Sequence, residues 1–127
     1  MRALIVDDSA VIRRFLKLVL EPEGIEVTEA VDGIEALKVL QCGVPVDLAF
    51  LDWRLPGMDG YDVLNIMRSD CKFDQTKVLM VSTETDKHLI QQALDAGADE
   101  YVMKPFTRDV IVEKVHELRH KNRREQA

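Results

Sequence analysis

The sequence predicts a doubly wound α/β domain, in which helices cover both faces of one parallel sheet. Five short strand-like segments alternate strictly with five helix-like segments, and four of the strand-like segments are almost continuously apolar. Strands buried on both faces of a parallel sheet are apolar in this way, and strict alternation is typical of α/β folds. The length of 127 residues fits one such domain and is too short for two.

The strand-like segments differ in how completely they are apolar. The segment from Ile25 to Ala30 is more polar and mostly alternates, which favours an edge strand. The other four have the composition of central, buried strands. They are Ala3–Val6, Leu48–Leu51, Val78–Val81 and Tyr101–Met103.

The helical segments follow from the spacing of apolar residues and from the residues that end each run. In the first, Ile12, Phe15, Leu16, Val19 and Leu20 share one face, and a proline and a glycine follow. Right-handed crossovers would place these helices on both faces of the sheet. The remaining four are expected at 34–40, 61–68, 87–96 and 110 to about 121.

Composition and charge exclude several classes of function. The net charge is −6, and residues 114–124 hold five basic residues and one acidic one, so the rest of the chain is more acidic still. An acidic body argues against direct nucleic-acid binding, which depends on cationic surface. No apolar run reaches the roughly 18 residues of a membrane span.

With no secretory signal and only two cysteines, Cys42 and Cys71, we expect a reduced, cytoplasmic protein. The sulfur of each cysteine is interpreted as a small apolar filler rather than as a redox switch.

Charged and hydroxyl side chains follow the carboxyl ends of four strands. Asp7 and Asp8 follow the first strand, Asp52 the third, Ser82 the fourth and Lys104 the fifth. Ligands of doubly wound sheets bind at this edge. Carboxylates crowded together repel one another unless a cation lies between them.

An oxygen-only ligand set without Cys or His favours Mg²⁺, or Mn²⁺, over zinc. One carboxylate beside such an ion is a nucleophile for a phosphoryl group, with a lysine and a hydroxyl to stabilise the phosphoryl oxygens. The pattern therefore predicts a phosphoryl-acceptor site.

Five stretches at these strand ends carry a resemblance to a known family: LIVDDSAVIRR, AVDGIEAL, DLAFLDWRLPGMDG, VLMVSTET and AGADEYVMKPF. Over its whole length the chain resembles the receiver domains of two-component response regulators, above all CheY-like single-domain regulators. The resemblance implies a flavodoxin-like sheet in the order 2-1-3-4-5. It implies a receiver domain over residues 1–122 and a polar tail over 123–127.

The resemblance also implies a role for each matching residue. Asp52 would be the phosphoacceptor, modified to 4-aspartylphosphate. Asp8 would bind Mg²⁺ directly and Asp7 mainly through water, while Asp52 and the backbone carbonyl of Arg54 complete the metal's protein ligands.

Further roles fall on the last two strands. Ser82 would turn toward the phosphoryl group, Lys104 would pair with its oxygens, and the bond from Lys104 to Pro105 is expected to be cis. Tyr101 would move inward when the active state forms, and the surface of the fourth helix, fifth strand and fifth helix would bind the target.

The resemblance implies a histidine kinase as phosphodonor and a protein target such as a flagellar motor switch or a phosphotransfer protein. The protein would be a switch rather than an enzyme, apart from its own phosphorylation and dephosphorylation, and a monomer or weak dimer. Chemotaxis control is the first interpretation. A phosphorelay shuttle and a receiver module cut from a longer transcription regulator remain alternatives.

Two other functional interpretations are excluded by particular residues of the sequence. A phosphatase of the haloacid-dehalogenase type needs a second carboxyl two residues after its nucleophile, and that position is Arg54. A nucleotide or flavin binder needs a Gly-rich or hydroxyl-rich first loop to hold phosphate, whereas this chain has Asp7 and Asp8 there, which would repel it.

We also hypothesise that Arg54 and Glu84 pair over the site and obstruct the water that would hydrolyse the acyl phosphate.

Overall fold

The computed structural model describes residues 1–83 and 85–120, and in them the chain forms a five-stranded parallel sheet. Its strand order is β2-β1-β3-β4-β5, as the family resemblance implied. The sequence placed all five strands to within a residue or two of their ends. The strands are β1 (Arg2–Val6), β2 (Glu26–Ala30), β3 (Leu48–Asp52), β4 (Lys77–Ser82) and β5 (Glu100–Met103).

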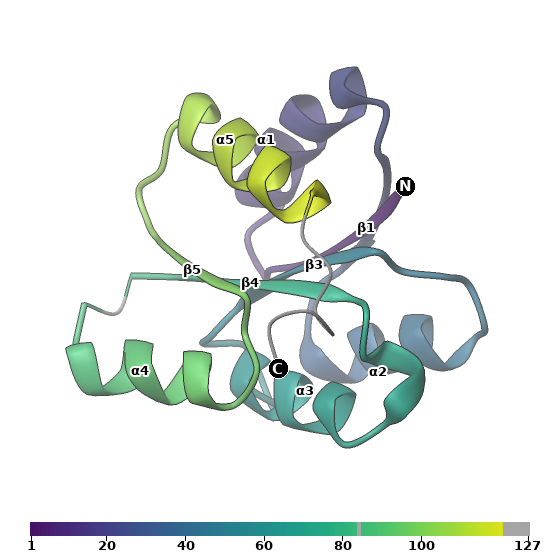
Figure 1. The fold of residues 1–127 in the computed structure, drawn as a ribbon, viewed down its shortest axis with the longest axis vertical. Coiled ribbons are helices and arrows are strands. Elements are labelled where there is room, and N and C mark those ends of the chain that lie inside the picture. Colours follow the sequence, from purple (N-terminus) through teal and green to yellow (C-terminus); the bar gives the residue numbers. More distant parts are fainter. Residues whose placement is uncertain (84, 121–127) are drawn as a thin grey trace.

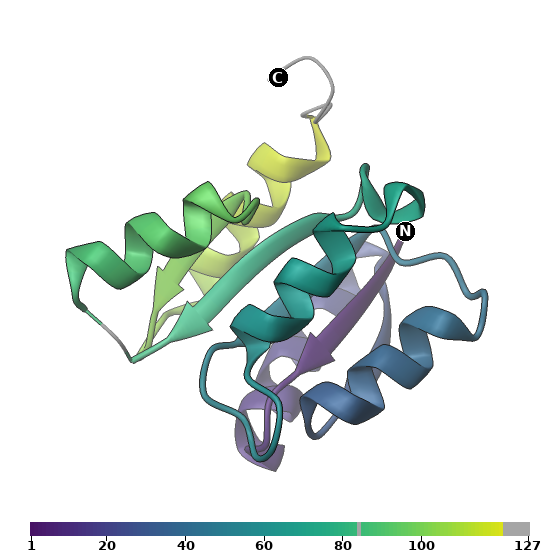
Figure 2. The same cartoon turned by 90° about the horizontal axis from the view of Figure 1, so that it is seen from below.

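Five α-helices cover the sheet in two layers, which confirms the doubly wound class (Figures 1 and 2). In Figure 1, α1 and α5 lie on one face, and α2, α3 and α4 lie on the other. Two short 3₁₀ turns, η1 (Glu21–Glu23) and η2 (Cys71–Phe73), follow α1 and α3. The helices are α1 (Ala10–Leu20), α2 (Gly33–Gln41), α3 (Gly60–Arg68), α4 (Lys87–Asp95) and α5 (Arg108–Arg119).

The core has two halves, one on each face of the sheet, because successive strand side chains point to opposite faces. Ile5 and Phe50 are buried with the inward faces of α1 and α5. Leu4 and Leu51, their neighbours along the strands, are buried with α2 and α3. This two-sided burial is the reason that the strand segments are almost continuously apolar.

Polar side chains fix where several helices begin. Ser9 and Thr107 accept hydrogen bonds from the amides of Ile12 and Val110, and thereby cap α1 and α5. Asp32 and Asp86 cap α2 and α4 in the same way. Such caps satisfy amides that have no partner within the helix, and they place each helix start at the carboxyl end of the preceding strand.

Two expectations were wrong. The segment ending at Met103 was expected to be buried on both faces, but β5 is an edge strand and Met103 is 49% exposed. The interpretation of Cys42 and Cys71 as small apolar fillers does not hold either, because both are free thiols at exposed positions. Each follows the end of a helix, where the chain turns at the surface.

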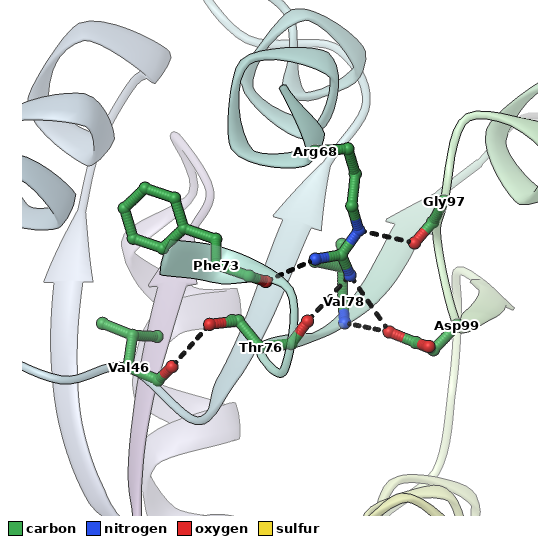
Figure 3. A network of polar contacts seen from close by, with 7 residues as sticks. All are labelled: Val46, Arg68, Phe73, Thr76, Val78, Gly97 and Asp99. Carbon is green, nitrogen blue, oxygen red and sulfur yellow. Dashed lines mark hydrogen bonds and ion pairs between the residues drawn. The ribbon is translucent and has the colours of Figure 1, made fainter. Parts of the chain in front are cut away.

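A largely buried arginine ties together the end of the sheet at which β4 begins (Figure 3). From the end of α3, Arg68 donates to the carbonyl oxygens of Gly97, Phe73 and Thr76 at 3.0, 2.8 and 2.7 Å. It also pairs with Asp99 at 3.3 Å, and Asp99 accepts from the amide of Val78 at 2.8 Å. One guanidinium thus joins α3, η2, the residue that precedes β4 and the segment that leads into β5.

None of the helices among the described residues combines the length and the apolar character that a membrane span requires. The predicted tail at 123–127 and the boundary at residue 122 lie outside the described residues.

Candidate functional site

Three carboxylates meet at the carboxyl ends of β1 and β3. Asp7 and Asp8 follow β1 directly, and Asp52 is the last residue of β3. The register pairs Val6 with Leu51, so the residues that follow these two lie side by side. One carboxylate oxygen of each aspartate lies within 4.8 Å of the others. The sequence had predicted this cluster.

Lys104 lies between two of these carboxylates. Its Nζ donates to Asp7 Oδ2 at 2.8 Å and to Asp52 Oδ2 at 3.1 Å. The three side chains are largely buried, with exposed fractions of 16%, 4% and 9% for Lys104, Asp7 and Asp52. The ammonium group is therefore a fixed cation at the place where the carboxylates converge. The peptide bond that joins it to Pro105 is cis, as the family resemblance implied.

The surroundings of the site raise the pKa values of both Asp52 and Lys104. Burial raises the pKa of Asp52, the neighbouring carboxylate of Asp7 raises it further, and Lys104 only partly offsets this. Burial alone would lower the pKa of Lys104, but hydrogen bonds and charge from Asp7 and Asp52 outweigh burial and raise it. Both pKa values are raised, but for different reasons. Lys104 faces two anions, which favour its charged form, whereas Asp52 is buried beside one cation and one anion, so its charged form is disfavoured.

The loop after β1 is held by its own polar groups. The Asp7 amide donates to the carbonyl of Ala30 at 3.1 Å. The amide of Ser9 donates to Asp7 Oδ1 at 2.8 Å. Asp7 thus uses one carboxylate oxygen for its own loop and the other for Lys104. The carboxylate of Asp8 is exposed and faces the same cluster.

The other predicted residues surround this cluster. Ser82 is the last residue of β4 and is 1% exposed, and its carbonyl accepts from the amide of Lys104 at 2.8 Å. Tyr101 lies half-buried on β5 opposite Met80. Arg54 is exposed and makes a backbone hydrogen bond to Asp52. Glu84 lies outside the described residues, and so does the pairing proposed for it.

An aromatic pair beside the site was not predicted. Trp53, the residue after Asp52, is 8% exposed and stacks on Tyr61 of α3, with 5.0 Å between ring centroids and 7° between ring planes. The signal in the sequence was a tryptophan next to the predicted phosphoacceptor. It gave no indication of which element the ring would contact.

The donor chemistry of the cluster fits a hard divalent cation. Its three candidate ligands are all carboxylates, and in the described part of the chain no histidine or cysteine joins them. Mg²⁺ is usually held by one or two carboxylates, and it keeps several waters. Asp8, the exposed member, is open to such an ion from solvent, whereas Asp7 and Asp52 already share Lys104.

The fold and the site define a class: a doubly wound α/β protein in which the carboxyl ends of the strands carry a cluster of aspartates and a largely buried lysine. Residues 3–116 match the response regulator receiver domain family, and the chain belongs to that family.

Chemotaxis proteins of two bacteria match most of the chain. The chemotaxis protein CheY of Pseudomonas aeruginosa is 41% identical over 119 residues, which cover 93% of this chain and 95% of that protein. The structure of Vibrio cholerae CheY4 matches with a TM-score of 0.86 and 31% identity, over 92% of this chain and 97% of that one.

A third relative carries ligands in its solved structure. The response regulator TrrA of Thermotoga maritima, solved in complex with Mg²⁺ and BeF, matches with a TM-score of 0.80 and 38% identity. The match covers 92% of this chain and 97% of that one.

Proposed function

We propose that this receiver domain is a cytoplasmic signalling switch that accepts a phosphoryl group on Asp52 from a histidine kinase and then binds a protein target in chemotaxis control. The observation that carries the proposal is the Lys104 ammonium, 2.8 Å from Asp7 and 3.1 Å from Asp52. It provides a fixed cation beside a carboxylate, at the edge of the sheet where doubly wound proteins bind their ligands.

The transfer is an in-line displacement. An oxygen of the Asp52 carboxylate attacks phosphorus, the new P–O bond forms as the P–N bond to the donor's phosphohistidine breaks, and the released imidazole takes a proton. Bound at Asp8, Asp52 and the backbone carbonyl of Arg54, with Asp7 acting through water, Mg²⁺ would neutralise charge on the phosphoryl oxygens. Lys104 transfers its hydrogen bond from the Asp52 carboxylate to a phosphoryl oxygen.

Ser82 and Tyr101 would carry the change to the surface. Ser82 lies at the end of the strand beside Asp52, and in the proposed switch its hydroxyl turns toward the phosphoryl group. Tyr101, half-buried on the neighbouring edge strand, then moves into the space released. This biases an equilibrium between two packings of α4, β5 and α5, and a target that prefers one packing binds it more tightly.

An exposed apolar face of α1 supports docking of the phosphodonor. Val11 is 78% exposed, Leu18 58% and Phe15 37%. Phe15 and Phe106 lie 5.7 Å apart by ring centroids, in a shallow apolar pocket that Lys104 also lines. Apolar side chains left on the surface around an active residue are typical of an interaction site.

The first test is phosphorylation by acetyl phosphate with Mg²⁺, followed by intact mass. Wild type gains the mass of one phosphoryl group, Asp52→Asn does not, and chelation of Mg²⁺ prevents the gain. Asp62→Asn, at an exposed position in the first turn of α3, is the matched control and keeps it. Phosphorylation of Asp52→Asn to the wild-type extent would contradict the proposal.

The second test concerns the target. Wild type loaded with Mg²⁺ and beryllofluoride is used as bait in lysate of the source cell, beside Asp52→Asn under the same conditions. Enrichment of a flagellar motor-switch protein on the loaded wild type supports chemotaxis control. Recovery of kinases or phosphotransfer proteins alone supports a phosphorelay shuttle. Equal capture by both baits contradicts switching through Asp52.

We propose that the domain acts as a monomer or weak dimer, and as a switch rather than as an enzyme with a separate substrate.

A further inference from the structure

Arg13 of α1 reaches back to the loop that carries the first two aspartates. Its Nη1 donates to the main-chain carbonyl oxygen of Asp7 at 2.6 Å, and its Nε donates to Glu29 Oε1 at 3.1 Å. The Arg13 side chain is 14% exposed and that of Glu29 is 39% exposed. The guanidinium therefore bridges the β1–α1 loop and the end of β2.

We propose that Arg13 is a positioning residue for the metal site, which holds the backbone between Asp7 and Asp8 so that the Asp8 carboxylate faces Asp52. The inference rests on the proposed function, because the proposed phosphoryl transfer requires a metal ion at this site. Arg13 itself bonds to the Asp7 carbonyl and to Glu29, so its effect on the site passes through the backbone.

The geometry shows how one carbonyl controls the next side chain. The peptide unit that links Asp7 to Asp8 is planar, so fixing its carbonyl oxygen also fixes the plane from which Asp8 departs. The amide and the carboxylate of Asp7 are already bonded, to Ala30 and to Ser9 and Lys104. The Arg13 bond fixes the carbonyl, the remaining polar group of this residue.

Charge alone predicts the opposite effect on metal binding. Arg13 is a cation near three carboxylates, and a cation there competes with a bound metal ion. Removing it would then tighten metal binding. If Arg13 positions the loop, removing it weakens metal binding, because the carboxylates lose their alignment. The two explanations differ in sign.

The test is Mn²⁺ binding, measured by loss of the free-ion electron paramagnetic resonance signal, with Mg²⁺ affinity obtained by competition. We expect Arg13→Gln to weaken binding by about tenfold, the lower end of what partners of metal ligands contribute. Arg13→Lys keeps the charge but not the two-directional guanidinium, so its affinity lies between the two.

Arg14→Gln is the matched control. Arg14 is the next residue of the same helix and is exposed, so this substitution removes the same charge without breaking the Arg13 contacts. Its affinity stays at the wild-type value or rises slightly. Urea unfolding without metal establishes that each variant is folded under the binding conditions.

Glu29→Gln tests the second contact and covers the case in which Arg13→Gln does not fold. We expect it to weaken Mn²⁺ binding by about two- to threefold in the wild-type background. In a folded Arg13→Gln background it has no further effect, because the contact it breaks is already lost. An equal effect of Glu29→Gln in both backgrounds overturns the positioning role.

Failure of this inference is distinguishable from failure of the proposed function. Arg13→Gln binding as tightly as wild type, or more tightly, overturns the positioning role and leaves the metal site intact. Wild type that binds Mn²⁺ no better than Asp8→Asn overturns both.

Discussion

Gly60 lies against the backbone of Asp52, so closely that a Cβ added at Gly60 would overlap the Asp52 carbonyl oxygen and lie 2.9 Å from its carbonyl carbon. The amide of Gly60 donates to the carbonyl of Trp53 at 2.9 Å. The first turn of α3 is thus packed on the main chain of the proposed phosphoacceptor. A glycine is required here by the close approach of two backbones.

Gly60→Ala is predicted to displace the end of β3, since neither backbone has room to move independently. We expect a loss of about 2 kcal/mol in the free energy of unfolding, typical of overpacking, together with weaker Mn²⁺ binding. Gly43→Ala is the control, because Gly43 has a φ of +87° but open space around it. It costs about 1 kcal/mol and leaves Mn²⁺ binding unchanged. Urea unfolding and Mn²⁺ titration measure both effects.

Asp52→Asn is predicted to stabilise the metal-free protein at neutral pH. The pKa of Asp52 is raised in the folded state, so its ionised form is disfavoured there. This penalty is absent well below the ordinary value of 3.8, and it is complete once the pH exceeds the raised pKa. We expect the variant to gain free energy of unfolding at neutral pH, and this gain to vanish in acid. Urea unfolding across this range measures it, and a gain that persists in acid would contradict the assignment.

Lys104→Met leaves two buried carboxylates without their cation. The free energy of unfolding should fall by about 3 kcal/mol, as for a broken buried ion pair, and Mg²⁺ should restore more stability to the variant than it adds to wild type. Lys114→Met is the control. Its Nζ pairs with Glu100 at 3.2 Å, and the Lys114 side chain is 29% exposed. We expect a loss of at most about 1 kcal/mol, independent of Mg²⁺.

Arg68→Met breaks the network of Figure 3, in which the guanidinium bonds to the backbone of three segments and to Asp99. We expect a loss of about 3 kcal/mol, since three main-chain carbonyl oxygens lose their donor and the Asp99 carboxylate loses its guanidinium partner. Mn²⁺ binding stays unchanged, because this network lies at the opposite end of the sheet. Lys72→Met, whose exposed pair with Asp70 spans 3.9 Å, is the control and has little effect. Equal stability of the two variants would show that the network contributes nothing.

The sequence identified the strands and the acidic cluster because both leave a signal in residue types. Two-sided burial requires continuous apolar runs, and the carboxyl ends of parallel strands lie at one edge, so Asp7, Asp52 and Lys104 could be expected to meet. The cis bond and the strand order came from the family resemblance and are confirmed.

The Arg68 and Arg13 contacts could not be predicted in the same way. Arg68 donates mainly to main-chain carbonyl oxygens, and so does Arg13 in one of its two contacts. Every residue possesses such an oxygen, so these contacts leave no pattern in the sequence. The exposure of Met103 was missed because an apolar run of three residues does not distinguish an edge strand from a central one.

The bond between Lys104 and Asp7 joins residues that are 97 positions apart. During synthesis on the ribosome, the three aspartates emerge well before the lysine, so a chain that ends after β4 holds the acidic residues without their cation. Strands β1, β3 and β4 can pair by that stage, but the carboxylates are neutralised only after β5 and the Lys104 that follows it have been made. The proposed capacity to receive a phosphoryl group would thus be among the last properties that a newly made molecule acquires.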